Sequence, residues 1–270
     1  MATDQDNKPA QAPGGQGGRS AVAGRPSFAA TLLGLPAVLF ALITWQVVAH
    51  GPLLRLDEHL SRALVHPDRA SELLSDFGNV QVAVPVLAVT LAYVARWGRR
   101  AGVGRWWLPP LAAALLMALL PAVIVPLKDA TARHGTAVVP PGAGYYPSGH
   151  TATAAVAYGC ATLLLLPWLR SAAARRAAVT ACAVLVLGVS FGLVRRGYHW
   201  PLDVVASWCL GAVLLSALWL LLGRTGRPTR PKQQSAPEGP MTSGGRCPRR
   251  TDEVGGADSV GGSDSAVRTS

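Results

Sequence analysis

The residues best suited to chemistry begin with Ser148, Gly149 and His150, which stand between a loop rich in Pro and Gly and the apolar run 152–166. Ser is a good N-cap, and a helix start offers unpaired N–H groups and a partial positive charge. Such a helix start suits an anion such as phosphate. Ser148 and Gly149 are therefore predicted to bind a phosphate group on which His150 moves a proton. An ordinary capped helix with an interfacial His is the alternative interpretation.

A second pair, His199 and Asp203, stands where another apolar run begins, over about residues 201–222. Residues four apart on a helix share a face, so the two side chains can touch. A carboxylate one turn inside a membrane helix is costly unless it is paired, and His199 is its predicted partner. The carboxylate would fix the imidazole tautomer and leave the other ring nitrogen free as a nucleophile or base. A structural pair that closes the helix end is the alternative.

Four cations are predicted to join these groups at one membrane face. Lys128 and Arg133 follow the third apolar run, and Arg195 and Arg196 precede the sixth. Cations and helix N–H groups together stabilise the charge that spreads over the phosphate oxygens in phosphoryl transfer. The four side chains are therefore candidate phosphate ligands, although Arg195 and Arg196 could instead be headgroup anchors.

Together these groups outline a phosphoryl-transfer mechanism. His199, oriented by Asp203, attacks phosphorus and forms a phosphohistidine. His150 protonates the leaving oxygen and then activates water to release phosphate. The sequence has no Walker-type Gly loop, metal-ligand cluster or Ser-His-Asp order that would support a metal or serine mechanism.

Long helices must position these groups, and the composition provides them. The chain has 270 residues, of which 50% are hydrophobic and 14% charged. The apolar residues gather in runs long enough to cross a bilayer, so the formal net charge of +11 does not indicate a nucleic-acid binder. We predict an all-α fold, a six-transmembrane helix bundle, with spans at about residues 28–49, 80–95, 106–127, 149–168, 177–194 and 201–222.

The loop between the first two spans has its own helical pattern. Four leucines recur there at helical spacing, with Asp57, Glu58 and Arg62 among them: Leu53, Leu56, Leu60 and Leu64. This pattern predicts a short amphipathic helix on the membrane surface. A loop helix packed on the bundle is also compatible with it.

The positions of Lys and Arg predict the orientation. The polar segments 1–26 and 224–270 are predicted to be disordered tails on either side of the domain 27–223. The N-terminal tail and the second and fourth loops carry ten Lys and Arg, whereas the first, third and fifth loops carry seven. Since basic residues stay on the cytoplasmic side, both termini are predicted cytoplasmic. The third and fifth loops, which hold the candidate active site, then lie at the outer face of the cell membrane.

These residues resemble the type 2 phosphatidic acid phosphatase superfamily, the lipid phosphatase and haloperoxidase-like group, and in particular its bacterial membrane members. The middle motif of that family, Pro-Ser-Gly-His, is complete and ends at His150. The end of its third motif, His-x-x-x-Asp, is complete from His199 to Asp203, and Lys128 matches the Lys that opens its first motif. The resemblance covers about residues 50–222. It implies six spans, a metal-independent reaction, His199 as nucleophile, His150 as acid–base residue and Asp203 as the orienting carboxylate.

Two positions depart from the family pattern. Gly135 stands where the first motif has an Arg, and Leu193 stands where the third motif has another. The nearest cations are Arg133 for the first position, and Arg195 and Arg196 for the second. An Arg side chain can span a two-residue offset in a loop, so we expect a working but altered site.

We therefore predict an integral membrane phosphatase that acts in lipid metabolism on a lipid phosphate or diphosphate, such as phosphatidic acid, phosphatidylglycerol phosphate or undecaprenyl diphosphate. The expected partners are this lipid substrate and the bilayer, with no cofactor, metal or nucleic acid and no prediction of oligomeric state. A lipid phosphotransferase with the same site is one alternative. A non-catalytic protein that binds or transports a lipid phosphate is another, and the missing Arg positions favour it.

Overall fold

The computed structural model describes residues 28–224, which belong to one compact unit, Met1–Thr229. The predicted tails, 1–26 and 224–270, lie outside the described residues except for position 224. Six of the described helices are long and apolar enough to cross a membrane, which confirms the predicted all-α, six-span bundle. These spans are α1 (Phe28–Val48), α4 (Val80–Arg100), α5 (Leu108–Thr131), α6 (Gly149–Leu165), α7 (Ala172–Arg195) and α8 (Pro201–Arg224).

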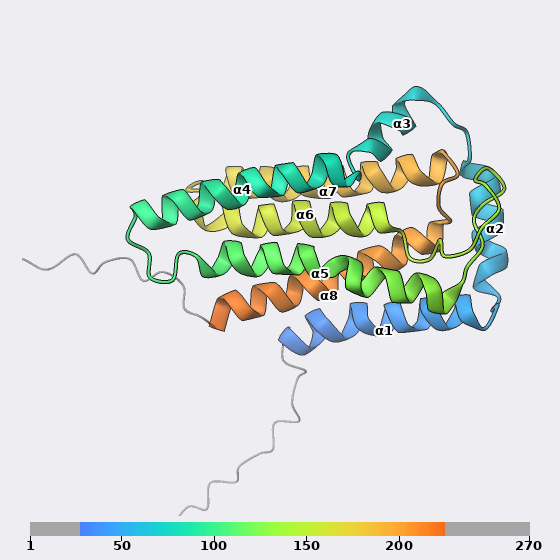
Figure 1. Cartoon of the computed structure of the whole chain (residues 1–270), viewed down its shortest axis with the longest axis horizontal. Coiled ribbons are helices and arrows are strands. Elements are labelled where there is room, and N and C mark those ends of the chain that lie inside the picture. Colours follow the sequence, from blue (N-terminus) through green and yellow to red (C-terminus); the bar gives the residue numbers. More distant parts are fainter. Residues whose placement is uncertain (1–27, 225–270) are drawn as a thin grey trace, which may run out of the picture. The chain divides into compact units, whose positions relative to one another are not determined.

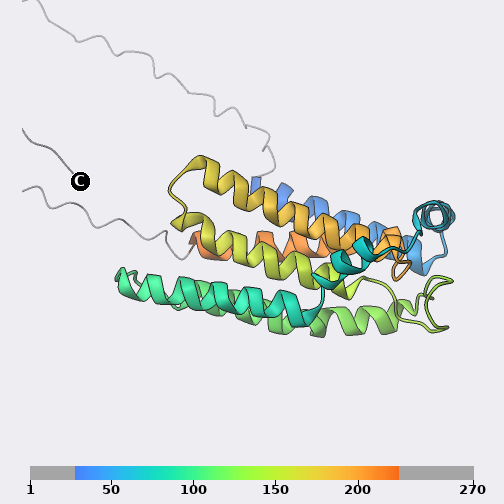
Figure 2. The same ribbon diagram turned by 90° about the horizontal axis from the view of Figure 1, so that it is seen from above.

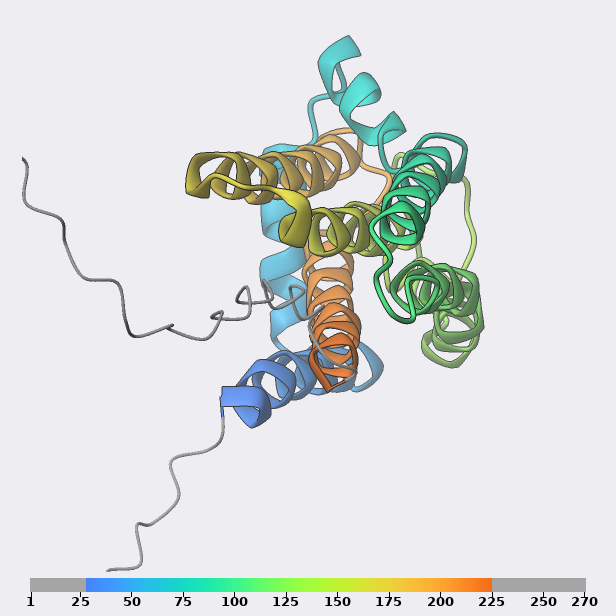
Figure 3. The same cartoon turned by 90° about the vertical axis from the view of Figure 1, so that its left-hand side faces the viewer.

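Helix α6 is the centre of the bundle. It packs against α4, α5, α7 and α8, and Figure 3, which looks along the helices, shows it surrounded by them. Helix α1 lies outside this ring and packs on α8. Most of α6 is buried, whereas α1 exposes most of its apolar side chains. Such exposed apolar faces are what a bilayer covers, so the outer helices meet lipid and α6 does not.

Small side chains allow α6 to lie this close to its neighbours. Its first three turns consist mainly of Ala, Thr and Gly, which keep the helix surface low. On α8, a Cβ atom added at Gly211 would lie only 2.9 Å from the Cβ atom of Ala155. The close approach of α6 and α8 therefore needs Gly at position 211, and it sets the distance between the two helix starts.

Both of those helix starts lie at the same end of the bundle, which we call the site end. Figures 1 and 2 show the loop 132–148, the start of α6, the end of α7 and the start of α8 together at this end. The short helix α2 (Leu53–Leu64) crosses the site end at a steep angle to the spans, and α3 (Arg69–Asp76) packs against α7. A 3₁₀ turn, η1 (Leu166–Trp168), ends α6 at the opposite end.

Helix α2 is the short helix predicted for the first loop, and its faces are distributed unusually. The four leucines of the predicted pattern are 39–54% exposed, and the fifth leucine of α2, Leu54, is partly buried on the bundle. The residues that α2 buries fully are the polar Asp57 and Ser61. An apolar stripe that does not pack on protein is what an interfacial helix presents to lipid. The helix thus packs on the bundle with a face that buries polar side chains, and it keeps four of its five leucines outward.

Several spans extend beyond the apolar runs. Lys128, predicted just after the third span, lies in the last turn of α5, and Arg195 lies in the last turn of α7. Long cationic side chains can reach the membrane interface from inside a helix end, and they interact favourably with the helix C-terminus. A prediction that ends a span at its first charged residue therefore ends α5 and α7 before the helices themselves end.

We expect Gly211→Leu to destabilise the bundle, because the new side chain would collide with Ala155 on α6. Overpacking of this kind costs about 1–3 kcal/mol. The melting temperature of the detergent-solubilised protein, measured by fluorescence-detected size exclusion, should fall by several degrees. Gly34→Leu is the matched control, since a Cβ atom at Gly34 meets no atom within 4 Å. An equal loss in both variants would contradict the packing explanation.

Candidate active site

The start of α6 has the capped geometry that the sequence predicts. Ser148 is the N-cap, and its side-chain oxygen accepts a hydrogen bond from the backbone N–H of Thr151 at 3.3 Å. The N–H of Ala152 bonds to the carbonyl of Ser148. Within residues 28–224, the N–H groups of Gly149 and His150 have no acceptor. Two free donors at a helix start are suited to hold an anion.

His199 and Asp203 meet at the start of α8. The Nδ1 atom of His199 lies 3.3 Å from Oδ2 of Asp203, and both residues are buried. The sequence predicts that the two residues share one face of a helix. In the structure α8 begins at Pro201, after His199, so the contact instead spans the start of the helix. The same Oδ2 atom accepts the backbone N–H of Trp200, which holds the turn. With Nδ1 facing a carboxylate, Nε2 is the nitrogen left free.

The backbone of Asp203 joins the two helix starts. Its carbonyl accepts the N–H of Ser148 at 3.2 Å. The hydroxyl of Ser207 lies 2.8 Å from the carbonyl oxygens of both Ser148 and Asp203. These three residues are fully buried, so the loop that leads into α6 is tied to the first turn of α8. This tie brings the two histidines into one space.

His150 has a partner that the sequence analysis missed. Its Nε2 atom lies 2.8 Å from Oδ1 of Asn79, the residue before α4. The amide nitrogen of Asn79 donates to Oδ1 of Asp76 at 3.0 Å, so the amide oxygen must face His150. Nε2 of His150 is thus the protonated nitrogen, and Nδ1 is the one available for proton transfer. The sequence did contain a signal for this partner. Asn79 is a polar residue at the start of a predicted span, on the membrane face that holds the candidate site.

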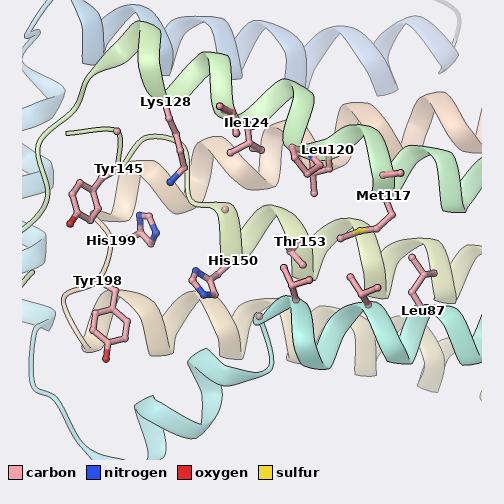
Figure 4. A pocket seen from close by; sticks show the side chains of 18 of the residues that line it. Leu87, Met117, Leu120, Ile124, Lys128, Tyr145, His150, Thr153, Tyr198 and His199 are labelled. Carbon is pink, nitrogen blue, oxygen red and sulfur yellow. The ribbon is translucent and has the colours of Figure 1, made fainter. Parts of the chain in front are cut away.

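A cavity of about 990 Å³ extends from the two histidines into the bundle. Figure 4 shows His150, His199 and the amine of Lys128 pointing into its head, with Tyr145 and Tyr198 beside them. The ring of Tyr145 meets the ring of His199 edge-on, with centroids 6.2 Å apart. The rest of the cavity runs between α4 and α5 and is lined mainly by apolar side chains, including Leu87, Leu91, Met117, Leu120 and Ile124.

Lys128 is the cation among the lining residues of this cavity. It projects from the last turn of α5, and its amine makes no ion pair within the described part of the chain. The other three cations predicted as phosphate ligands, Arg133, Arg195 and Arg196, do not line the cavity.

Arg133 lies behind His199 and is engaged by two carboxylates. Its Nη1 atom donates to Oδ1 of Asp203, and its Nη2 atom donates to Oδ2 of Asp57, both at 2.5 Å. Its side chain is 8% exposed and lies over the ring of Trp200. Burial raises the pKa of Asp57, and the Arg133 guanidinium counteracts that rise. Arg133 thus fixes the position of the Asp203 carboxylate, which in turn contacts His199.

Arg195 and Arg196 turn toward α3 and its N-cap. Arg195 donates to Asp68 at 2.8 Å, and Arg196 lies 3.7 Å from Glu72. Hydrogen bonds from the backbone N–H of Ser71 and from Arg195 lower the pKa of Asp68 to about 2, so this carboxylate is ionised at neutral pH. These ion pairs fasten α3 to the end of α7.

Leu193, at the position where the family pattern has Arg, belongs to the buried apolar core. Within the part of the chain that the structure describes, no Arg side chain takes its place at the head of the cavity, where Lys128 supplies the positive charge. Among residues 28–224, no three His, Cys, Asp or Glu side chains come together as metal ligands.

A comparison with family models decides the relationship. Residues 111–227 match the model described as the PAP2 superfamily. This region is therefore similar to the PAP2 superfamily. The match contains α6, α8, His150, His199 and Asp203, which confirms the resemblance predicted from the motifs, whereas Asp57 and Asn79 precede it. A search of curated proteins found no match.

The PAP2 fold also extends beyond that region. The solved structure of a transmembrane PAP2 type phosphatidylglycerolphosphate phosphatase from Bacillus subtilis matches with a TM-score of 0.60 and 19% identity. The match covers 74% of this chain and 100% of the other. At this identity the likeness establishes the fold. The chain is therefore a multi-pass membrane protein with a PAP2-type helical bundle.

We expect Asn79→Ala to lower turnover about tenfold, since a lost hydrogen bond of about 1.4 kcal/mol at His150 corresponds to that factor. Asn79 makes no side-chain capping bond to α4, so the helix start should survive. The measurement is kcat for phosphate release from a lipid phosphate. Thr90→Ala, which removes a side-chain bond to the α4 backbone on the exposed surface, is the control. Equal rates for Asn79→Ala and the wild type would show that the contact does not orient His150.

Proposed function

We propose that this protein is an integral membrane phosphatase that hydrolyses a lipid phosphate or diphosphate through a phosphohistidine on His199. The PAP2 match and the membrane phosphatase with the same fold support a lipid phosphatase in general. The observation that carries the proposal is the placement of His199: Nδ1 faces Asp203, and the ring lies at the polar head of an apolar cavity. The free Nε2 atom is then the nucleophile.

In the first step Nε2 of His199 attacks phosphorus, and the bond from phosphorus to the lipid oxygen breaks. The N–P bond replaces it, and His150 donates a proton to the departing oxygen from Nδ1. In the second step His150 takes a proton from water, whose oxygen attacks phosphorus. The N–P bond breaks, inorganic phosphate leaves, and Nε2 of His199 regains its lone pair. Asp203 stabilises the imidazolium character that develops on His199 during both steps.

The phosphate oxygens need donors at the head of the cavity. Lys128 supplies one positive charge there, and the free N–H groups of Gly149 and His150 supply two further donors. Ser148 supports them as the N-cap of α6. Preorganised donors of this kind stabilise a phosphoryl transition state without rearrangement. Arg133, Arg195 and Arg196 do not take part in this cradle, because carboxylates already hold them.

The apolar length of the cavity supports a substrate with a hydrocarbon tail. The cavity continues from the histidines between α4 and α5, two of the outer helices of the bundle. A water-soluble phosphate would leave this apolar surface unused, whereas an acyl or prenyl chain would cover it. Phosphatidic acid, phosphatidylglycerol phosphate and undecaprenyl diphosphate all have the required phosphate head and apolar tail.

We further propose that residues 27–223 form the phosphatase domain and that the site end faces outward from the cell membrane. The support is the count of Lys and Arg in the sequence, which is ten in the N-terminal segment and the second and fourth loops and seven in the first, third and fifth loops. A substrate in the outer leaflet could then reach the site end. The orientation can be tested with a reporter protein that is active only in the cytoplasm. Fused after residue 270, this reporter should be active.

His199→Ala should abolish phosphate release, with a loss of at least about a thousandfold, because the nucleophile is removed. The assay uses the purified protein in detergent with EDTA present and a long-chain lipid phosphate. His134→Ala is a matched control, since its side chain is exposed and its contacts are those of the backbone, with Ala143 and with the indole N–H of Trp200. Wild-type activity that disappears with EDTA, or persists in His199→Ala, would contradict the mechanism.

Met117→Trp should impair long-chain substrates selectively, because the larger side chain fills the apolar part of the cavity. Loss of contact with about two methylene groups corresponds to about a tenfold lower kcat/KM. A short-chain phosphate, which does not reach position 117, should keep its kcat/KM. Leu115→Trp on the exposed face of α5 is the control. Equal effects on both chain lengths would argue against this cavity as the tail site.

A further inference from the structure

Helix α2 buries one carboxylate against the bundle. Four of its five leucines are exposed and Leu54 is partly buried, whereas Asp57 is buried to 1% exposure. A buried carboxylate is retained at a real cost unless it is paired, so its partners indicate what it does. Asp57 has two of them, and both lie beside the turn that carries His199.

The first partner of Asp57 is the start of α8. Its Oδ1 atom accepts the backbone N–H of Leu202 at 2.9 Å. Leu202 is the second residue of α8, and this N–H is one of those that a helix start leaves unpaired. Asp57 therefore caps α8 from another helix, next to the turn that carries His199.

The second partner continues to the nucleophile. Oδ2 of Asp57 lies 2.5 Å from Nη2 of Arg133, and Nη1 of Arg133 lies 2.5 Å from Oδ1 of Asp203. The remaining oxygen of Asp203, Oδ2, lies 3.3 Å from Nδ1 of His199. Asp57, Arg133 and Asp203 thus form a carboxylate–arginine chain that reaches from α2 to the imidazole, with a separate oxygen for each contact.

The charges of this chain bear on the chemistry of His199. One guanidinium is shared between two carboxylates, so the chain carries a net negative charge. If Asp57 were neutral, the positive charge of Arg133 would be balanced by Asp203 alone. Less of the negative charge of Asp203 would then remain to stabilise a protonated imidazole. The burial of all three side chains makes such an effect larger than it would be in water.

We infer that Asp57 is a positioning residue for His199: through Arg133 and Asp203 it fixes the orientation of the imidazole and sustains its basicity. The hydrogen bond that Asp57 accepts from the backbone N–H of Leu202 also fixes the turn that carries His199. The inference rests on the proposed role of His199 as nucleophile. It assigns a role in the reaction to a helix outside the family match, since α2 precedes residue 111.

The test compares Asp57→Asn with Glu58→Gln. Both changes remove one negative charge from α2, but Glu58 is exposed and its side chain makes no ion pair within the described residues. Asn can still accept the Leu202 N–H, so the cap on α8 is kept. The titratable and charged groups around His199 that enter the comparison are Asp203, Arg133, Asp57, Lys128, His150 and Tyr145.

In Asp57→Asn we expect kcat to fall about tenfold while KM stays within about a factor of two, the size of effect that outer partners have on a ligating histidine. The ascending limb of the pH–rate profile should move to lower pH, because loss of a negative charge disfavours the protonated imidazole. Glu58→Gln should match the wild type in kcat and in the position of the limb.

A second readout needs no turnover. Diethyl pyrocarbonate acylates neutral imidazole, and mass spectrometry of the His199 peptide gives the rate above the titration range. This labelling should be slower in Asp57→Asn than in the wild type and in Glu58→Gln. An inactive wild type would count against the proposed function alone, because the labelling comparison would still test the chain.

Several results would overturn the inference. One is an Asp57→Asn variant with wild-type kcat, pH profile and labelling rate. Another is a lower kcat with an unmoved limb and unchanged labelling, which would indicate general destabilisation, and a third is an equal loss in Glu58→Gln. If Asp57→Asn does not fold, Asp57→Glu keeps the charge and displaces the carboxylate by one methylene. It should lower kcat and leave the pH limb in place, and wild-type kcat in this variant would overturn the inference.

Discussion

The site end depends on the sharing of one guanidinium by two buried carboxylates. Arg133 from the loop before α6 joins Asp57 of α2 to Asp203 of α8, at 2.5 Å on each side. Removing one member of such a buried group leaves an uncompensated charge, which typically costs about 3–5 kcal/mol. The same contacts cap the start of α8 and fix the carboxylate beside His199. Stability of this end and orientation of the proposed nucleophile therefore rest on the same atoms.

Packing around α6 supplies the second constraint. The small residues of α6 and Gly211 of α8 bring the two helix starts together, and the backbone contact between Ser148 and Asp203 ties them. The start of α6 is consequently held at the head of a cavity with two N–H groups that have no acceptor within residues 28–224. A helix start held in this way can bind an anion without moving.

The two histidines are held in the same physical manner by different partners. An oxygen acceptor occupies one nitrogen of each ring, Asp203 for His199 and Asn79 for His150. The charged acceptor favours an imidazole that becomes cationic, as a nucleophile does, and the neutral amide suits a group that exchanges a proton in both directions. This difference supports the proposed roles of His199 as nucleophile and His150 as acid–base residue. The proposed position of the lipid tail is the apolar cavity between α4 and α5.

The sequence alone determined the six spans, the capped start of α6 and the pairing of His199 with Asp203, because hydrophobic runs, N-cap residues and a four-residue spacing are local signals. The tertiary structure decided which cations meet the cavity. Lys128 does, whereas Arg133, Arg195 and Arg196 are held by carboxylates that are distant in sequence. It also decided that Asn79 and Asp57 support the site. A charged side chain in a loop can pair with any opposite charge that folding brings near, so its partner follows from packing and not from spacing.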